Sequence, residues 1–172
     1  MIMKNGVIYI TGVLLICGLL FFTGCVNYLR PELGAVARVD ARVSLVDDQI
    51  SSAVLKTKDL ELEYALSSDG ETFEISGKLI FDRSITASYP MLRRFVMRVN
   101  FLDATGAVIE SASIAPNINT HSEVPDVIQL RSSGIKPPGA TAIAFNYFGT
   151  FSSATLRSGG DESWEAFYMP FD

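Results

Sequence analysis

Residues 60–81 decide the fold, and they read LELEYALSSDGETFEISGKLIF. Apolar side chains occupy nearly every second position on both sides of a short polar segment, and this two-residue period is typical of strands with one buried face. Asp69-Gly70 lies at the centre of the polar segment, and this dipeptide favours the tight turn of a β-hairpin. We therefore predict two antiparallel strands joined at Asp69-Gly70.

The two-residue period returns farther along the chain. Residues 92–102 place Phe95, Met97, Val99 and Phe101 on one face, and a turn at 103–106 leads into a further strand at 108–114. Other strands are predicted at 126–130, 141–151 and 164–171, separated by loops at 84–90, 115–125, 131–139 and 152–163.

About seven short strands with turns between them predict a mainly β protein. The expected arrangement is an antiparallel β-sandwich of the immunoglobulin or fibronectin-III type, formed by residues 58–172. The cysteine pair of immunoglobulin domains is absent, so the comparison concerns architecture only.

Residues 35–57 allow two interpretations. Apolar residues recur there at spacings of three and four, which is the stripe of an amphipathic helix. A shorter run with a spacing of two fits an additional strand, and valine prefers sheets. We predict the helix because its pattern is longer than a typical strand. The helical stripe consists of Val36, Val39, Val43, Val46, Ile50 and Ala53. The alternating run consists of Val39, Ala41, Val43 and Leu45.

Several predicted strands are apolar on both faces. Val96 and Leu102 lie opposite the row that contains Phe95, and the last strand carries aromatic residues on both sides. A sheet with one solvated face would alternate more cleanly. We expect the segment at 35–55, or a partner protein, to cover the second face. The aromatic residues of the last strand, expected in the core, are Trp164, Phe167, Tyr168 and Phe171.

The first 25 residues have the layout of a secretory signal, with Lys4 followed by an uncharged apolar run and small residues at its end. The run ends at Phe22-Thr23-Gly24-Cys25, which resembles the lipobox of bacterial lipoproteins. The resemblance implies that residues 1–24 are a signal peptide, cut between Gly24 and Cys25. It also implies that Cys25 then carries diacylglycerol and usually a third acyl chain. The alternative is an uncleaved membrane-spanning anchor, because no charge lies between Lys4 and Arg30.

The lipoprotein resemblance also implies a location. Val26 follows the cysteine where an aspartate often retains Gram-negative lipoproteins in the inner membrane, so the outer membrane facing the periplasm is expected. The alternative is anchorage in the inner membrane with the domain outside the cytoplasm. Residues 25–34 are polar and are expected to form a short tether.

Composition excludes several kinds of function. Removing residues 1–24 leaves 148 residues, enough for one self-supporting domain, and changes the formal net charge from −5 to −6. A negative chain argues against nucleic acid, whose phosphates need a basic surface. With Cys17 removed and Cys25 acylated, the chain keeps no free thiol and no disulfide, so thiol catalysis and cysteine–metal sites are excluded.

Candidate chemical groups each have an ordinary explanation. His121, the only histidine, lies in a polar loop beside Ser122, and no Gly-x-Ser-x-Gly motif accompanies it. Glu61 and Glu63 would lie about 6.6–6.8 Å apart on one strand face, a separation at which carboxylates can cleave glycosidic bonds. Alternate glutamates are, however, typical of a solvated strand face.

Two further groups could bind ions. Arg94 and Arg98 share a strand face, and cross-strand pairing with a glutamate such as Glu74 is their ordinary role. Residues 69–71 and 159–162 offer oxygen ligands for calcium, but turn chemistry explains both and the spacing of a calcium loop is missing. We predict no catalytic residue, no metal site and no cofactor.

The sequence therefore predicts a membrane-tethered envelope lipoprotein that acts as a non-catalytic binding or assembly module. Its partners would be the membrane, through the lipid anchor, and another envelope protein. Strand edges, loops or an uncovered apolar face would make the contact. The alternatives are a carrier for an apolar ligand held between sheet and helix, and a hydrolase using Glu61 and Glu63.

Overall fold

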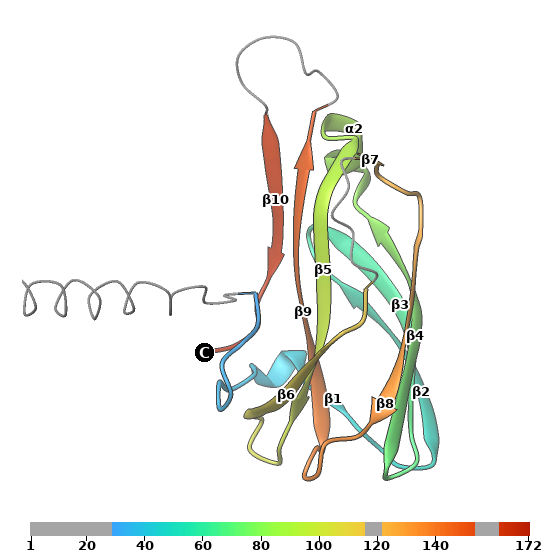
Figure 1. Cartoon of the computed structure of the whole chain (residues 1–172), viewed down its shortest axis with the longest axis vertical. Coiled ribbons are helices and arrows are strands. Elements are labelled where there is room, and N and C mark those ends of the chain that lie inside the picture. Colours follow the sequence, from blue (N-terminus) through green and yellow to red (C-terminus); the bar gives the residue numbers. More distant parts are fainter. Residues whose placement is uncertain (1–28, 116–121, 154–161) are drawn as a thin grey trace, which may run out of the picture.

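The computed structural model describes residues 29–115, 122–153 and 162–172. The described chain folds into two antiparallel sheets packed face to face, which confirms the predicted mainly β sandwich (Figure 1). The sheets contain ten strands rather than about seven, and Cys25, Gly24 and His121 lie outside the described residues.

The first sheet is built around the predicted hairpin and has the strand order β2-β3-β4-β8. Its turn is confirmed at Asp69-Gly70, where Gly70 adopts a φ of 92°, a conformation that only glycine reaches without strain. The fourth strand continues to Ile135, into the segment predicted as a loop at 131–139, because it pairs with β4 over its whole length. The strands are β2 (Gln49–Lys56), β3 (Leu60–Ser68), β4 (Thr72–Phe81) and β8 (Ile128–Ile135).

The second sheet is centred on its two longest strands, β5 and β9, which pair from Met91↔Ser152 to Leu102↔Ala142. A short helix with Asp82 as its N-cap connects β4 to β5, within the segment predicted as a loop at 84–90. The elements are β1 (Val43–Ser44), α2 (Arg83–Ser88), β5 (Met91–Leu102), β6 (Val108–Ser113), β7 (Ser122–Glu123), β9 (Ala142–Ser152) and β10 (Ser163–Tyr168).

The core lies between the two sheets and is rich in aromatic side chains. Phe81 of the first sheet packs edge-on against Phe95 and Phe151 of the second, with ring centroids 5.0 and 4.9 Å apart. Phe73 and Phe101 make an equivalent contact at 4.8 Å. Such pairs contribute about 0.5–1.5 kcal/mol each beyond the burial of their area. The inward rows predicted for β3, β4 and β5 are therefore confirmed.

The predicted amphipathic helix at 35–57 is wrong. These residues form a 3₁₀ turn, η2 (Val39–Ala41), followed by β1 and β2. The two-residue turn Lys58-Asp59 brings β2 beside β3, and all eight residues of β2 pair with that strand. Sheet pairing therefore outweighs a helical stripe made largely of β-branched residues. Val39 and Ile50 of that stripe are 79% and 77% exposed, so the stripe does not face a core.

The second face of the β5–β9 sheet is partly covered, but not by a helix at 35–55, and of that segment residues 35–37 contribute to the cover. Residues 29–37 and the C-terminal end lie on it, as the blue and red segments beside β10 show in Figure 1. Gly34 N donates to Val108 O at 2.8 Å, and Ala37 packs with Leu102 and Ala144 in a small second core. The part of the predicted tether from residue 29 onward is therefore packed on the domain.

Candidate functional site

The candidate site is the open edge of the first sheet, formed by β2. This strand pairs with β3 on one side, and no strand of the described chain pairs with its other side. Every residue of β2 except Leu55 is exposed. An unpaired strand of eight residues offers a row of free backbone donors and acceptors to another chain.

The hydrogen-bonding pattern shows which residues present these groups. Thr57 N donates to Leu60 O at 3.0 Å, so this is a hydrogen-bonded pair of the β2–β3 ladder. Hydrogen-bonded and non-hydrogen-bonded pairs alternate in an antiparallel ladder, so every second residue of β2 directs its backbone groups away from β3. These outward-directed residues are Ile50, Ser52, Val54 and Lys56.

The edge lacks the usual protection against pairing. Natural sheets protect their edges with proline, charge, bulges or very short strands. β2 contains no proline, its pairing with β3 has no register shift, and its only charged residue is Lys56 at the end. Ile50 and Val54 are 77% and 56% exposed on the outer face. The strand is thus a suitable template for an incoming strand.

A shallow hollow of about 660 Å³ adjoins β2 on the outer face of the sheet. Small side chains form its floor, and Gly77 lets β3 and β4 approach closely, because a Cβ at this position would lie 2.5 Å from Glu63 O. The hollow is an open depression beside the edge, where a docked segment could place side chains. It is lined by Ser52, Ala53, Val54, Glu63, Tyr64, Ala65, Ser76, Gly77, Lys78, Gln129, Leu130 and Arg131.

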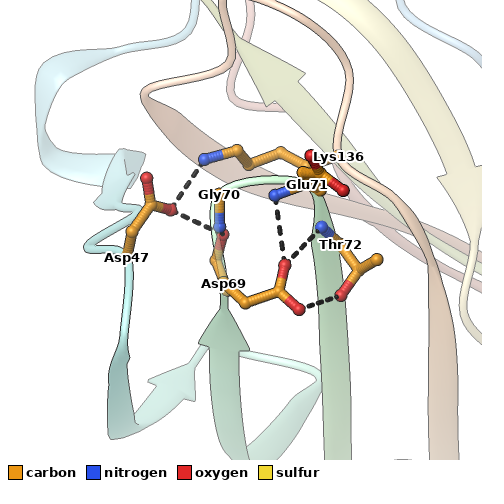
Figure 2. Close-up of polar contacts among 7 residues, drawn as sticks. Asp47, Asp69, Gly70, Glu71, Thr72 and Lys136 are labelled. Carbon is orange, nitrogen blue, oxygen red and sulfur yellow. Dashed lines mark hydrogen bonds and ion pairs between the residues drawn. The ribbon is translucent and has the colours of Figure 1, made fainter.

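The N-terminal end of β2 is held by an ion pair. Asp47 Oδ1 accepts hydrogen bonds from Lys136 Nζ and from Ser68 Oγ, both at 2.7 Å (Figure 2). The hydrogen bonds from Lys136 and then from Ser68 lower the pKa of Asp47. Lys136 follows β8, so this contact joins the two edges of the first sheet across the hairpin turn.

The C-terminal end of β2 is held by a buried polar cluster. Asp59 is 1% exposed, and its Oδ2 accepts hydrogen bonds from Tyr147 Oη at 3.1 Å and from Phe167 N at 3.2 Å. Tyr147 Oη also lies 2.6 Å from Thr57 Oγ1. Burial raises the pKa of Tyr147, and the nearby Asp59 carboxylate adds to the effect. Contacts within the chain therefore hold both ends of β2.

The structure separates most of the groups singled out in the sequence. Glu61 and Glu63 lie on the outer face of β3, where Glu61 is 3.3 Å from Lys56 and Glu63 is opposite Lys78. Asp69 uses its carboxylate within the hairpin turn, accepting from Thr72 N at 2.6 Å and from Glu71 N at 3.1 Å (Figure 2). The prediction that turn chemistry explains Asp69 is confirmed.

The remaining candidates lie elsewhere. Arg131, not Arg94 or Arg98, pairs with Glu74, at 3.0 Å. No group of three or more potential metal ligands occurs in the part of the chain that the structure describes. The apolar-carrier alternative placed its ligand between a sheet and the helix at 35–55, and that helix does not form.

Sequence reasoning missed the β2 edge. The alternating run at 39–45 indicated a strand before β2 but ends at Leu45, and nothing in the sequence shows whether a strand is central or at an edge. That position depends on the other strands of the sheet.

Comparisons with known proteins add no further constraint. A scan against protein-family models, a search of curated proteins and a search of solved structures found no match to this chain. Within the described ranges, no helix has the length and apolar character needed to cross a membrane.

Proposed function

We propose that this chain is a lipid-anchored binding module of the cell envelope, which captures an extended segment of a partner protein along β2. The observation that carries the proposal is the exposed, unprotected edge of that strand. The anchor is the acylated Cys25, and the expected location is the outer membrane facing the periplasm. No catalytic step is part of the function.

Strand addition explains how such a module would bind. Backbone hydrogen bonds to Ile50, Ser52, Val54 and Lys56 would supply affinity without requiring a particular partner sequence. Specificity would come from alternate side chains of the partner, which would contact Val54 and the hollow on the outer face. Because β2 is held at both ends, little ordering of this protein is needed on binding.

The partner we propose is an extended segment of another envelope protein with alternating apolar residues. Ile50 and Val54 offer two exposed apolar contacts on the outer face, separated by the small Ser52. Charged residues lie farther in, with Glu63 opposite Lys78, so a segment of mixed charge suits this surface better than one of a single sign.

A proline at the edge tests this proposal. Ser52→Pro removes an outward N–H that the β2–β3 ladder does not use, so the fold is retained while strand addition is blocked. The matched control is Ser52→Ala, which keeps the N–H. We expect Ser52→Pro to lose the partner in pull-downs from solubilised membranes, and Ser52→Ala to retain it. Thermal unfolding of both variants verifies that the domain is folded.

Site-specific crosslinking identifies the surface directly. A photo-crosslinking residue at Val54 is expected to capture the partner in cells, whereas one at Ile80, a comparably exposed position on the central strand β4, is not. A pull-down that recovers only the bait, together with a monomeric chain in solution, would contradict the proposal. A crosslink between two copies of the chain would identify the partner as the protein itself.

A further inference from the structure

The part of the β5–β9–β10 sheet not covered by residues 29–37 carries an apolar row on its outer face. Strand register places Val96, Phe148 and Phe167 opposite one another across three strands. Phe167 is 46% exposed, although its place in an aromatic run favoured the core. Phe148 is 7% exposed, so Phe167 is the aromatic side chain of this row that lies at the surface, where it is available to another phase or molecule.

Arginines flank this apolar row. Arg94 and Arg98 lie on either side of Val96 on the same face of β5, and neither forms an ion pair with a described residue. Arg98 Nε is buried without a hydrogen-bond partner among these residues. Burial, and then the positive charge of nearby Arg30, lower the pKa of Arg98. Like charges have therefore gathered where no carboxylate of a described residue forms an ion pair with Arg94 or Arg98.

Among the described residues, an acidic side chain also lies on this surface. Glu165 lies in the row of Arg94, with Thr150 of β9 between them, and no ion pair joins it to a described arginine. The face thus carries Arg30, Arg94 and Arg98 against Glu165, a local positive balance on a chain whose net charge is −5. Phosphate groups are natural partners for such a cluster, because guanidinium binds them in bidentate geometry.

The chain enters the domain at this same face. Leu29 is 4% exposed, and its carbonyl accepts a hydrogen bond from Asn146 Nδ2 at 2.9 Å, on the outer face of β9. Only three residues, 26–28, lie between Cys25 and this fixed point. The four steps from Cys25 to Leu29 span at most about 14 Å even when fully extended. A lipid on Cys25 would therefore hold this face, rather than the β2 edge, near the bilayer.

We propose that this arginine–aromatic face rests on the anionic phospholipid headgroups of the membrane that holds Cys25. The inference depends on the lipid anchor in the proposed function and adds an orientation to it. Arg30, Arg94 and Arg98 contact headgroup phosphates, and Phe167 inserts among the headgroups, where aromatic side chains are favoured. The β2 edge, on the other sheet, then faces away from the membrane, as the positions of β2 and β10 in Figure 1 illustrate.

The test measures orientation in the full chain, purified from membranes and returned to phosphatidylcholine vesicles with or without phosphatidylglycerol. Trp164→Phe removes the single native tryptophan. A new tryptophan is then placed at the proposed contact with Phe167→Trp, or on the opposite sheet with Ile80→Trp. These positions are 46% and 47% exposed and are therefore matched. Quenching by lipids spin-labelled at the headgroup reports proximity to the bilayer surface.

We expect strong quenching at position 167 and little at position 80, with the difference greatest in phosphatidylglycerol vesicles. Arg94→Ala and Arg98→Ala should each reduce the lipid-contacting population by up to about fivefold, since each basic residue near an anionic surface favours contact by roughly that factor. Arg131→Ala, on the opposite sheet, is the control and should leave the quenching at position 167 unchanged. Far-UV circular dichroism verifies that every variant is folded.

Equal quenching at the two positions would overturn the inference. Quenching at position 167 that changes neither with phosphatidylglycerol nor with the arginine substitutions would overturn it as well. Vesicle flotation separates this failure from that of the anchor. If the chain floats with vesicles but shows equal quenching at the two positions, the lipid anchor is supported and the proposed orientation is contradicted. A chain that does not float has no anchor, and the inference fails with it.

Discussion

At the scale of single residues, Tyr147 connects the two sheets through one hydroxyl group. It belongs to β9, whereas Thr57 and Asp59, which its hydroxyl contacts, border the turn between β2 and β3. Asp59 is buried, so its carboxylate depends on protein donors. The cluster therefore holds the turn that positions the β2 edge against the second sheet.

We predict that Tyr147→Phe lowers the free energy of unfolding by about 1–3 kcal/mol, because Asp59 loses a donor in a place that water does not reach. Chemical denaturation measures the change. Tyr168→Phe is the matched control, since Tyr168 stacks on Tyr147 with ring centroids 5.8 Å apart and its hydroxyl forms no hydrogen bond within the described residues. Equal effects of the two substitutions would contradict the role of the hydroxyl.

Because of Tyr147, we also expect the stability of the domain to fall at alkaline pH. Burial raises the pKa of Tyr147 above its usual value of 10.0, so the folded state favours the neutral phenol. This contribution is fully present below pH 10.0 and is lost as the pH rises toward the folded-state pKa. Denaturation across this pH range should show that the free energy of unfolding of the wild type falls and approaches that of Tyr147→Phe. A constant difference between the two would exclude this linkage.

Asn146 joins the N-terminal segment to the sheet. Its Nδ2 donates to Leu29 O, and its Oδ1 accepts from Asn100 Nδ2 at 2.8 Å. We predict that Asn146→Ala removes the donor to Leu29 O, leaves Asn100 Nδ2 with Ala144 O as its remaining acceptor, and costs about 1–3 kcal/mol. Limited proteolysis should then cut near residue 29 earlier than in wild type. Thr150→Ala, on the same face of β9, is the control, and equal cutting in both variants would argue against the clamp.

At the scale of elements, the β3–β4 hairpin is closed by a carboxylate. Asp69 accepts from Glu71 N, Thr72 N and Thr72 Oγ1, and the hydrogen bonds from Thr72 lower the pKa of Asp69 below its usual 3.8. A lowered pKa contributes stability above pH 3.8, and this contribution is lost as the pH falls through the folded-state value.

We therefore predict that Asp69→Ala destabilises the domain at neutral pH and that its difference from wild type shrinks in acid. Glu71→Ala is the control in the same turn, because no hydrogen bond to its side chain is found among the described residues. Urea denaturation at neutral pH and below the usual carboxyl pKa measures both variants. A difference for Asp69→Ala that does not change with pH would contradict the turn's dependence on the ionised form.

At the scale of the whole molecule, the proposed anchor at Cys25 lies only a few residues before the first described residue, Leu29. We predict that Cys25→Ser abolishes the acyl mass and the cut after Gly24, whereas Cys17→Ser leaves both unchanged, because only Cys25 follows a small residue. Mass spectrometry of the purified chain measures the outcome. An intact Met1 end in wild type would replace the lipid anchor with the uncleaved alternative.

The hairpin at 60–81 and the long strands at 91–102 and 142–152 could be predicted from the sequence. Each shows its period within a few residues, and the turn chemistry of Asp69-Gly70 is local. Residues 49–56 were predicted as the end of a helix, because Ile50 and Ala53 continue the helical stripe and the alternating run ends at Leu45. Their strand state was decided by pairing with β3, a contact that propensity alone does not describe.

By itself the sequence determined the β class, the hairpin and the resemblance of Phe22–Cys25 to a lipobox, because these depend on neighbours along the chain. Only the tertiary structure decided that β2 is an open edge, that Leu29 is fastened to Asn146 and that Arg30 lies close to Arg98. These features join residues far apart in sequence. The physical reason is that an edge or a surface cluster is defined by what packs around it, and that is settled only when the whole chain folds.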